Sequence, residues 1–299
     1  MWWINLKRRC FMGLPVIMHV NYCEQGQTIP EMCKKAVAWG FDGIEFRRYR
    51  RGEDEAPEQY VDSIARSAEE SGLKHVLFGG PGIELTTDDA GAREKAVEEG
   101  LAFYKLAASK VDLTVCNIMA GSLRSSDPNV AGSDYHLHGS GAATDQHYEW
   151  AAEGFKPFGA QAEELGFKLA FEIHMGYVHD LPDPAMKLIG MIGSKGVGAN
   201  LDYGNMIYFP KAPSLSETIS TLGGSLYMVH LKNSMPYVGG RNPVGLGDGI
   251  INNREFLRLL KESGFDGPVC IEAPRPGDRE WFAQEDLRYI RSAMADLEM

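Results

Sequence analysis

The sequence predicts a single α/β domain of the (β/α)8 barrel class. From residue 15 onward, short apolar runs alternate with stretches of helical period, which is the pattern of βα units around a parallel sheet. The alternation continues through eight strand-like and eight helix-like segments. A closed barrel of this kind commonly takes about 250 residues, so the length also fits. We expect one domain over residues 1–299, with residues 1–14 as an N-terminal extension.

The composition is that of an acidic globular protein. A net charge of −11 and a pI near 5.3 argue against a general attraction to nucleic acid or to anionic membranes. No apolar stretch approaches the roughly 18 residues of a membrane span, and Pro15 leaves no room for a signal peptide. The cysteines are odd in number and lack CxxC spacing, which favours a reducing, cytoplasmic location over a disulfide framework. They are Cys10, Cys23, Cys33, Cys116 and Cys270.

The first half of the chain contains four βα units. Gly40, Gly72 and Gly166 mark the ends of three helices, and the run 87–89 offers N-caps for another. Strands are expected at residues 16–20, 43–46, 73–78 and 113–118, and helices at 29–39, 58–71, 87–108 and 148–165.

A long polar segment, residues 120–144, interrupts this rhythm. It is rich in Gly, Ser and Asp and contains Asp134, His136 and His138. Loops of such length inside a compact domain are usually functional, so this segment is a candidate lid, with a mobile surface loop as the alternative.

The second half is more regular. Strands ending near residues 172, 202, 230 and 272 alternate with helices after Pro182 and at 214–222, 253–263 and 279–297. A glycine-rich loop is expected after the seventh strand. An open doubly wound sheet is the alternative fold, but residues 21–24 lack the dinucleotide fingerprint after the first strand, and the glycines at 245–249 lack its strand-turn-helix context.

Each of the last four strands ends in a residue of a type that commonly binds metal ions in proteins. These residues are Glu172, Asp202, His230 and Glu272. In a (β/α)8 barrel the reactive groups lie at the carboxyl ends of the strands, so all four side chains should meet at one rim. Three carboxylates and an imidazole suit Mn²⁺, Co²⁺, Mg²⁺ or Zn²⁺. A single polar residue at a strand end is often only structural, but four in register predict a divalent metal site in which a carboxylate can also accept a proton.

Further candidates flank these ligands. His174 follows Glu172 by two residues, and Lys232 follows His230 by two, so each should face the same side of its strand as the ligand. We predict that His174 contacts the substrate as an orienting group or a base, and that Lys232 stabilises negative charge on it.

The remaining substrate-binding candidates lie in loops or at strand ends. Arg275 stands in the stiff segment 272–276 and is the better candidate for binding an anion. Glu45 ends the second strand, whereas the neighbouring Arg47 and Arg48 are expected to be solvated. Arg241 and His136 complete the set.

The chain resembles the sugar phosphate isomerase/epimerase superfamily, the xylose-isomerase-like TIM barrels. The most specific match is the C-terminal run 245–272, which looks like the glycine loop, helix and final metal-binding strand of that family. The resemblance implies a divalent metal, often manganese, held by the four predicted ligands. It also implies that Glu172 and Glu272 deprotonate and reprotonate the carbon beside a ketose carbonyl through a cis-enediolate. One position departs from the family pattern: Asn205 stands where members often have histidine.

The resemblance also implies an alternative activity. Some relatives are metal-dependent lyases or dehydratases, including subunits of complexes that cleave 3-oxo-glycosides, both O- and C-linked, by β-elimination. Their first step, proton loss beside a ketone, is the same as in epimerisation. The segment 120–144, His174 and His179 are candidate sources of an acid for the leaving group.

Two further classes fit less well. The DNA-repair endonucleases of the superfamily use additional histidines for three zinc ions, whereas this acidic chain has Gly79 and Gly80 after its third strand. A degenerate barrel acting as a scaffold would be expected to have lost at least one ligand. We therefore expect a sugar isomerase or epimerase with a small carbohydrate substrate, no nucleic acid or membrane partner, and either a homo-oligomer or a partner subunit.

Overall fold

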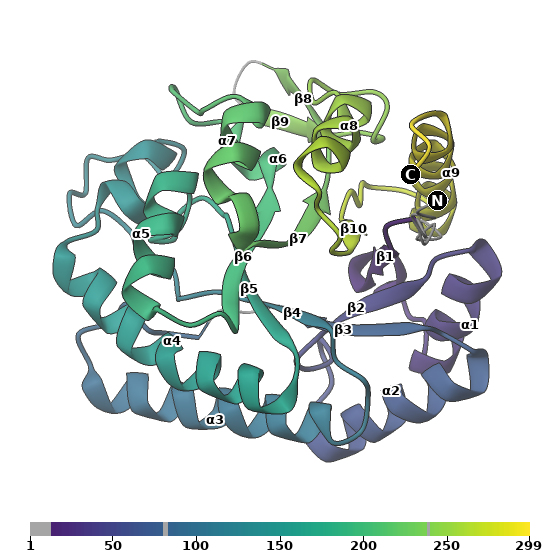
Figure 1. Ribbon diagram of the computed structural model, residues 1–299, viewed down its shortest axis with the longest axis horizontal. Helices are drawn as coiled ribbons and strands as arrows, with labels where there is room; N and C mark the ends of the chain where they lie inside the picture. Colours follow the sequence, from purple (N-terminus) through teal and green to yellow (C-terminus); the bar gives the residue numbers. More distant parts are fainter. Residues whose placement is uncertain (1–12, 80–82, 238–239) are drawn as a thin grey trace, which may run out of the picture.

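The computed structural model is a (β/α)8 TIM barrel, as the sequence predicts (Figure 1). The structure describes residues 13–79, 83–237 and 240–299, so Cys10 and most of the N-terminal extension lie outside the described residues. Eight parallel strands follow the order β3-β2-β1-β10-β7-β6-β5-β4, and the two end strands, β3 and β4, lie beside each other, so the barrel is nearly closed. The strands are β1 Val16–His19, β2 Gly43–Arg47, β3 His75–Gly79, β4 Val115–Ile118, β5 Lys168–Glu172, β6 Val197–Asp202, β7 Leu226–Leu231 and β10 Val269–Ile271.

Helices surround the barrel, and their ends follow local capping rules. Thr28 and Ser214 form capping boxes at the starts of two helices, while Gly40, Gly72 and Gly166 end three helices in the left-handed conformation. The helices are α1 Ile29–Trp39, α2 Pro57–Ser71, α3 Ala90–Ala108, α4 Asp145–Leu165, α5 Pro182–Ile192, α6 Tyr203–Met206, α7 Leu215–Leu222, α8 Asn253–Ser263 and α9 Arg279–Asp296.

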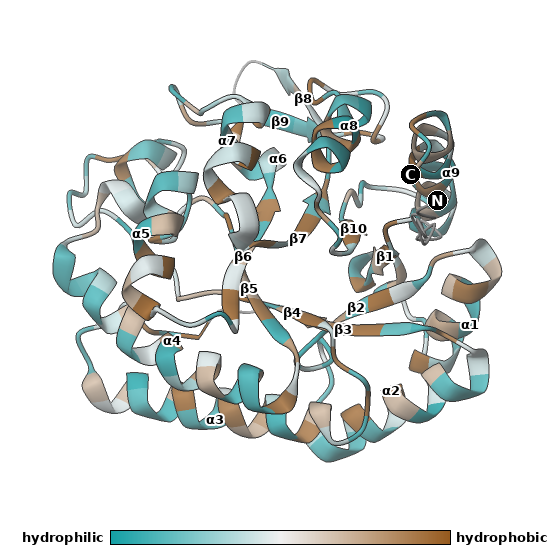
Figure 2. Cartoon of the chain, in the orientation of Figure 1, coloured by the Kyte–Doolittle hydropathy of each residue, from teal (hydrophilic) through white to brown (hydrophobic). Residues whose placement is uncertain are grey.

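The apolar core lies in two places. The larger part fills the space between the strands and the surrounding helices, and hydrophobic residues accordingly concentrate on the strands and the inward sides of the helices (Figure 2). A small cluster fills the barrel interior, with Ile17, Leu77, Val115, Ala170, Met228 and Cys270. Polar strand-end residues can therefore gather at the carboxyl rim above this interior cluster.

The predicted glycine-rich loop after β7 contains an unpredicted hairpin. Strand β8, Ser234–Tyr237, pairs antiparallel with β9, Gly240–Pro243, beside the carboxyl rim (Figure 1). The sequence did not predict these strands because they contain Pro236 and Pro243. Proline is unfavourable in most strands and is accepted only at edges such as these.

Partly buried hydrogen bonds hold the long segment after β4 together and attach it to the segment after β5. The backbone N–H of Ser125 donates to His138 Nδ1 (3.0 Å), and that of Ser140 donates to Asp180 Oδ2 (3.1 Å). Gly139 has φ +51°, and a Cβ there would lie 2.2 Å from Asp180 Oδ2, so only glycine fits. His138 thus has a structural role in shaping this segment.

Two further features concern the cysteines and the lengths of the helices. The cysteines in the described ranges, Cys23, Cys33, Cys116 and Cys270, are buried and free. Within the same ranges, no helix combines the length and apolar character that crossing a membrane requires.

Candidate metal centre

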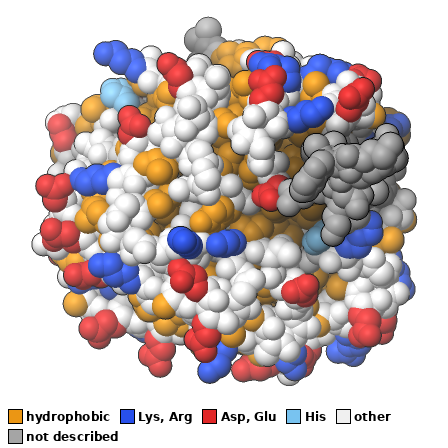
Figure 3. All heavy atoms as spheres, in the orientation of Figure 1, with side chains coloured by type: hydrophobic (Ala, Val, Ile, Leu, Met, Phe, Trp, Pro, Cys, Tyr) orange, Lys and Arg blue, Asp and Glu red, His pale blue; other side chains and the backbone are white. Residues whose placement is uncertain are grey.

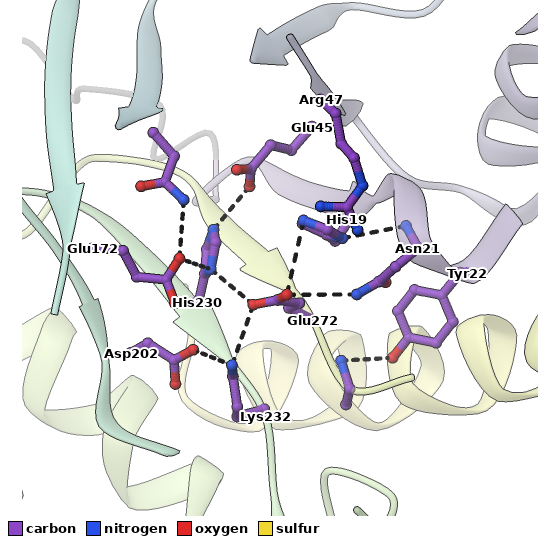
Figure 4. Close-up of polar contacts among 12 residues, drawn as sticks. His19, Asn21, Tyr22, Glu45, Arg47, Glu172, Asp202, His230, Lys232 and Glu272 are labelled. Atoms are coloured by element: carbon purple, nitrogen blue, oxygen red, sulfur yellow. Dashed lines mark hydrogen bonds and ion pairs between the residues drawn. The ribbon is translucent and has the colours of Figure 1, made fainter. Parts of the chain in front are cut away.

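The carboxyl ends of β5, β6, β7 and β10 bring Glu172, Asp202, His230 and Glu272 together (Figure 4). One ligand atom from each residue lies within 4.8 Å of the others. Strand register explains the convergence, since Asp202 pairs with His230 across the β6–β7 ladder. The backbone N–H of Glu272 also donates to Leu231 O (2.9 Å). Four side chains far apart along the chain therefore share one rim.

His230 is oriented by a glutamate on the far side of the barrel. Its Nε2 lies 2.8 Å from Glu45 Oε2, and its Nδ1 lies 3.1 Å from Glu272 Oε2 and 3.7 Å from Glu172 Oε2. Glu45 is fully buried, and Gly79 makes room for it, since a Cβ there would lie 2.0 Å from Glu45 Oε1. Glu45 therefore supports the imidazole, and it is not among the residues that line the adjacent cavity. The sequence predicted a contact of Glu45 with substrate, and the structure places Glu45 against His230 and outside the cavity lining.

The three carboxylates have different electrostatic surroundings. Burial raises the pKa of Asp202 to about 6, with Lys232 opposing the shift. Burial alone would also raise the pKa of Glu172 and Glu272, but His230 holds the pKa of Glu172 below its usual value. Lys232 and His19 together hold the pKa of Glu272 well below its usual value. Glu272 is therefore a carboxylate at neutral pH.

The donor set fits a divalent cation. Ligands about 2.0–2.2 Å from an ion stand up to about 4.4 Å apart, which is compatible with the observed cluster. Asp202 Oδ1 is buried without a hydrogen-bond partner among the described residues. Its Oδ2 meets the Lys232 ammonium at 2.5 Å as an ion pair that lacks hydrogen-bond geometry. Buried carboxylate oxygens this close together need compensating positive charge, which a metal ion would supply.

Two amides hold Glu172 in place. Asn117 Nδ2 donates to Glu172 Oε2 (3.0 Å), and Asn205 Nδ2 donates to Glu172 Oε1 (2.9 Å) and to Ile173 O (3.2 Å). The residue that replaces the family's frequent histidine thus orients a proposed ligand. Sequence reasoning missed Asn117, although an amide within the apolar strand β4 was a signal that it faces a polar site.

A cavity of about 290 Å³ opens beside the cluster. Its lining residues are His19, Arg47, Tyr49, Arg51, Asn117, Met119, Glu172, His174, Tyr177, Lys232 and Glu272. Two of the predicted substrate-binding residues, His174 and Lys232, are therefore brought to the site. The Lys232 ammonium also lies 3.3 Å from Glu272 Oε2, and nearby carboxylates raise its pKa against the opposing effect of burial.

A second hollow of about 180 Å³ lies on the other side of Lys232 and Glu272. Arg241 lines it from strand β9, with its guanidinium 4.6 Å from the centre of the Tyr208 ring. Arg241 is thus near the predicted site but separated from the larger cavity. A hollow of about 430 Å³ at the opposite end of the barrel is lined by strand starts, such as His75 and Lys168, and is remote from the cluster.

Two predicted substrate-binding residues lie elsewhere. Arg275 is 9% exposed, and its guanidinium binds Asp286 (2.7 Å) and Glu285 (2.7 Å) of α9. His136 is exposed in the short helix η2, Tyr135–Leu137. Neither is among the described residues that line the two cavities beside the cluster. Arg275 instead joins β10 to α9, and we leave both residues out of the proposed site.

The fold and this cluster define a class of protein: a (β/α)8 barrel with a candidate divalent-metal site at its carboxyl rim. Residues 33–293 match the family described as xylose isomerase-like TIM barrel, and the chain belongs to that family.

Three sequence relatives match parts of the chain. A protein of Methanocaldococcus jannaschii named as uncharacterised is 28% identical over 37% of this chain and 38% of its own length. Inosose dehydratase of Clostridium beijerinckii is 23% identical over 49% of this chain and 55% of that enzyme. Inosose dehydratase of Klebsiella pneumoniae is 25% identical over 67% of this chain and 72% of that enzyme. The first two matches thus span roughly half or less of the relatives' length.

Solved structures share the fold over nearly the whole chain. A Mycobacterium smegmatis xylose isomerase-like TIM barrel protein in complex with magnesium is 18% identical, with TM-score 0.72 over 95% of this chain and 97% of that one. D-psicose 3-epimerase with D-tagatose from Clostridium cellulolyticum H10 is 17% identical, with TM-score 0.74 over 94% and 99%. At these identities the likeness shows the fold alone.

Proposed function

We propose that this protein is a divalent-metal-dependent sugar isomerase or epimerase acting beside the carbonyl of a ketose or keto-sugar. The observation that carries the proposal is the pair Glu172 and Glu272, which both line the cavity and both contribute to the proposed metal cluster. An epimerase among the proteins of similar fold is consistent with it. We propose manganese as the metal, with Co²⁺, Mg²⁺ or Zn²⁺ as alternatives.

Glu172, Asp202, His230 and Glu272 would hold the ion. When bound, the metal would polarise the substrate carbonyl and the neighbouring hydroxyl. This would acidify the C–H bond of the carbon that bears the hydroxyl. Glu272 belongs to the cluster and lines the cavity, so its carboxylate can reach the substrate and accept the proton. Glu172 stands at the end of β5, which β6 and β7 separate from β10. In its protonated form it would return a proton to the opposite face of that carbon, and proton exchange with solvent would then restore both carboxyl groups. Removal of the proton from one face and its return to the other would invert the configuration of that carbon.

Two cavity residues would stabilise and orient the reacting group. The Lys232 ammonium can neutralise negative charge that develops on the carbonyl oxygen. His174 would orient a substrate hydroxyl through Nε2, because its Nδ1 lies 2.9 Å from Met175 O.

A second candidate is a lyase that loses water or another substituent after the same proton abstraction. The inosose dehydratase relatives favour it. His179, a predicted acid for the leaving group, is fully buried and accepts the Ala120 N–H at Nε2 (3.2 Å), so it does not reach the cavity. Tyr177 is better placed, because it lines the cavity and burial raises its pKa, which keeps its hydroxyl protonated.

Isotope exchange tests the proposal. The Mn²⁺-loaded protein should introduce deuterium from D₂O at the carbon beside the carbonyl of its ketose substrate, as detected by NMR. Glu272→Gln should abolish exchange, whereas Glu262→Gln, on the exposed face of α8, should not. Turnover without exchange would reject proton abstraction. Exchange accompanied by loss of water from the substrate, detected by mass spectrometry, would show that the protein is a lyase.

The remaining expectations extend this proposal. We propose one domain over residues 1–299, a small carbohydrate substrate and a cytoplasmic location. We also propose that the protein forms a homo-oligomer or acts together with a partner subunit.

A further inference from the structure

The segment between β2 and α2 concentrates positive charge in an acidic chain. Residues 47–51 read Arg-Arg-Tyr-Arg-Arg, within a protein of net charge −11. Elsewhere, on the face shown in Figure 3, acidic and basic side chains are interspersed. Four arginines within five positions therefore set this segment apart.

Alternate members of the run face the candidate active site. Arg47, Tyr49 and Arg51 line the cavity that also contains Glu172 and Glu272. Arg50 instead donates to Gln27 O (3.3 Å) and lies 4.0 Å from Glu53. Alternate side chains of residues 47–51 thus reach the cavity.

The two arginines of the cavity differ in their partners. Arg47 Nε donates to Glu24 Oε1 (2.7 Å) and its Nη2 donates to Glu24 Oε2 (3.2 Å), so its charge is compensated. This contact uses two of the five N–H donors of a guanidinium and leaves others free. Arg51 forms no salt bridge with any residue in the described part of the chain. Arg51 is exposed, and its charge helps to lower the pKa of Glu24, but no ion pair among the described residues occupies its guanidinium.

This charge is not needed by the proposed metal cluster. Three carboxylates are opposed there by Lys232, and a divalent ion would compensate the rest. A neutral sugar has no group that matches an unpaired guanidinium. An oxyanion does, because the planar guanidinium binds carboxylate and phosphate oxygens through paired hydrogen bonds.

We propose that the substrate carries an oxyanion, a phosphate ester or a carboxylate, which binds Arg51 with support from Arg47 at the end of the molecule away from the reacting carbon. This inference rests on the proposed function for the identity of the reacting end. The cavity of about 290 Å³ is of the size that a small sugar derivative fills. Arg51 is then the residue that separates charged from neutral keto-sugars.

Equilibrium binding to the Mn²⁺-loaded protein tests this without requiring turnover. Isothermal titration would compare D-ribulose 5-phosphate with D-ribulose for the phosphate arm, and 5-keto-D-gluconate with D-fructose for the carboxylate arm. We expect one charged probe to bind at least about tenfold more tightly than its neutral partner, with the preference weakening at high salt. The arm that shows the preference identifies the oxyanion.

Matched variants assign the preference to one side chain. Arg51→Ala should remove about tenfold of the affinity for the charged probe and leave the neutral probe and Mn²⁺ affinity unchanged. Arg50→Ala, one residue away and directed elsewhere, should leave all three unchanged. Equal binding of charged and neutral probes in both arms would overturn the proposal. An equal loss of affinity for the charged probe in Arg51→Ala and Arg50→Ala would also overturn it. Loss of deuterium exchange would instead reject the proposed isomerase chemistry, because exchange is measured separately.

Discussion

Glu45 and His230 meet across the barrel interior, with Glu45 Oε2 2.8 Å from His230 Nε2. This contact directs the other ring nitrogen, Nδ1, toward Glu172 and Glu272. Burial alone would lower the pKa of His230, but attraction to Glu45 and Glu272 holds it well above its usual value. Binding of a metal at Nδ1 would therefore displace a proton.

Replacing Glu45 by glutamine should weaken metal binding. The amide keeps the size of the side chain but removes the charge that makes His230 more basic. We expect Mn²⁺ affinity to fall about 10- to 100-fold, measured by calorimetric titration. Glu53→Gln, an exposed change in the segment after β2, is the control. Unchanged affinity in Glu45→Gln would show that the contact does not support the metal site.

Removing the metal should lower thermal stability. An ion bound only by the folded state adds to the free energy of unfolding and relieves repulsion among Glu172, Asp202 and Glu272. We expect a chelator to lower Tm by several degrees and added Mn²⁺ to restore it. Asp202→Asn should abolish this metal-dependent change. The same metal-dependent change in Tm in Asp202→Asn would show that the ion binds at another site.

Shortening Asn205 should lower turnover more than it lowers metal affinity. Its amide donates to Glu172 Oε1 at 2.9 Å, so Asn205→Ala leaves that oxygen without its donor and frees the carboxylate to move. We expect kcat to fall about tenfold, the typical scale for a lost orienting hydrogen bond to a charged group. Steady-state kinetics and Mn²⁺ titration would measure the two effects. A selective loss of metal affinity would contradict a positioning role.

Ionisation of Asp180 should make stability depend on pH. Burial raises the pKa of Asp180 to about 7, and its Oδ1 has no hydrogen-bond partner among the described residues. Because the folded-state pKa lies above the unfolded value, the stabilising contribution is present in acid and is lost as pH rises through about 7. Relative to Asp180→Asn, the wild type should lose unfolding free energy between about pH 4 and about pH 8 in urea titrations. A constant difference in unfolding free energy over this interval would exclude the raised pKa. Asp183→Asn, at an exposed position of α5, is the control.

Arg275 should contribute to stability and leave substrate affinity unaffected. Its guanidinium lies 2.7 Å from Asp286, which is 1% exposed, so Arg275→Ala leaves a buried carboxylate unpaired. We expect a loss of about 3 kcal/mol in unfolding free energy, with KM unchanged if the variant is assayed below its Tm. A large rise in KM without destabilisation would support the substrate-binding role predicted from sequence.

Strand periodicity and strand ends were sufficient to predict the barrel and the meeting of Glu172, Asp202, His230 and Glu272. Parallel strands bring their carboxyl ends to one rim, so a residue's place along its strand determines where it lies. The hairpin β8–β9 was missed because prolines hide its strand character.

The amino-acid sequence by itself determined the fold class and the cluster of proposed ligands, because both follow from local periodicity and strand-end position. Only the tertiary structure decided that Glu45 supports His230, that Arg275 binds α9, and that Arg51 faces the cavity. These roles depend on contacts between different elements, and Glu45 and His230 are 185 positions apart. The physical reason is that side chains of one type, such as the arginines at 50 and 51, differ in role only through the partners that folding brings within reach.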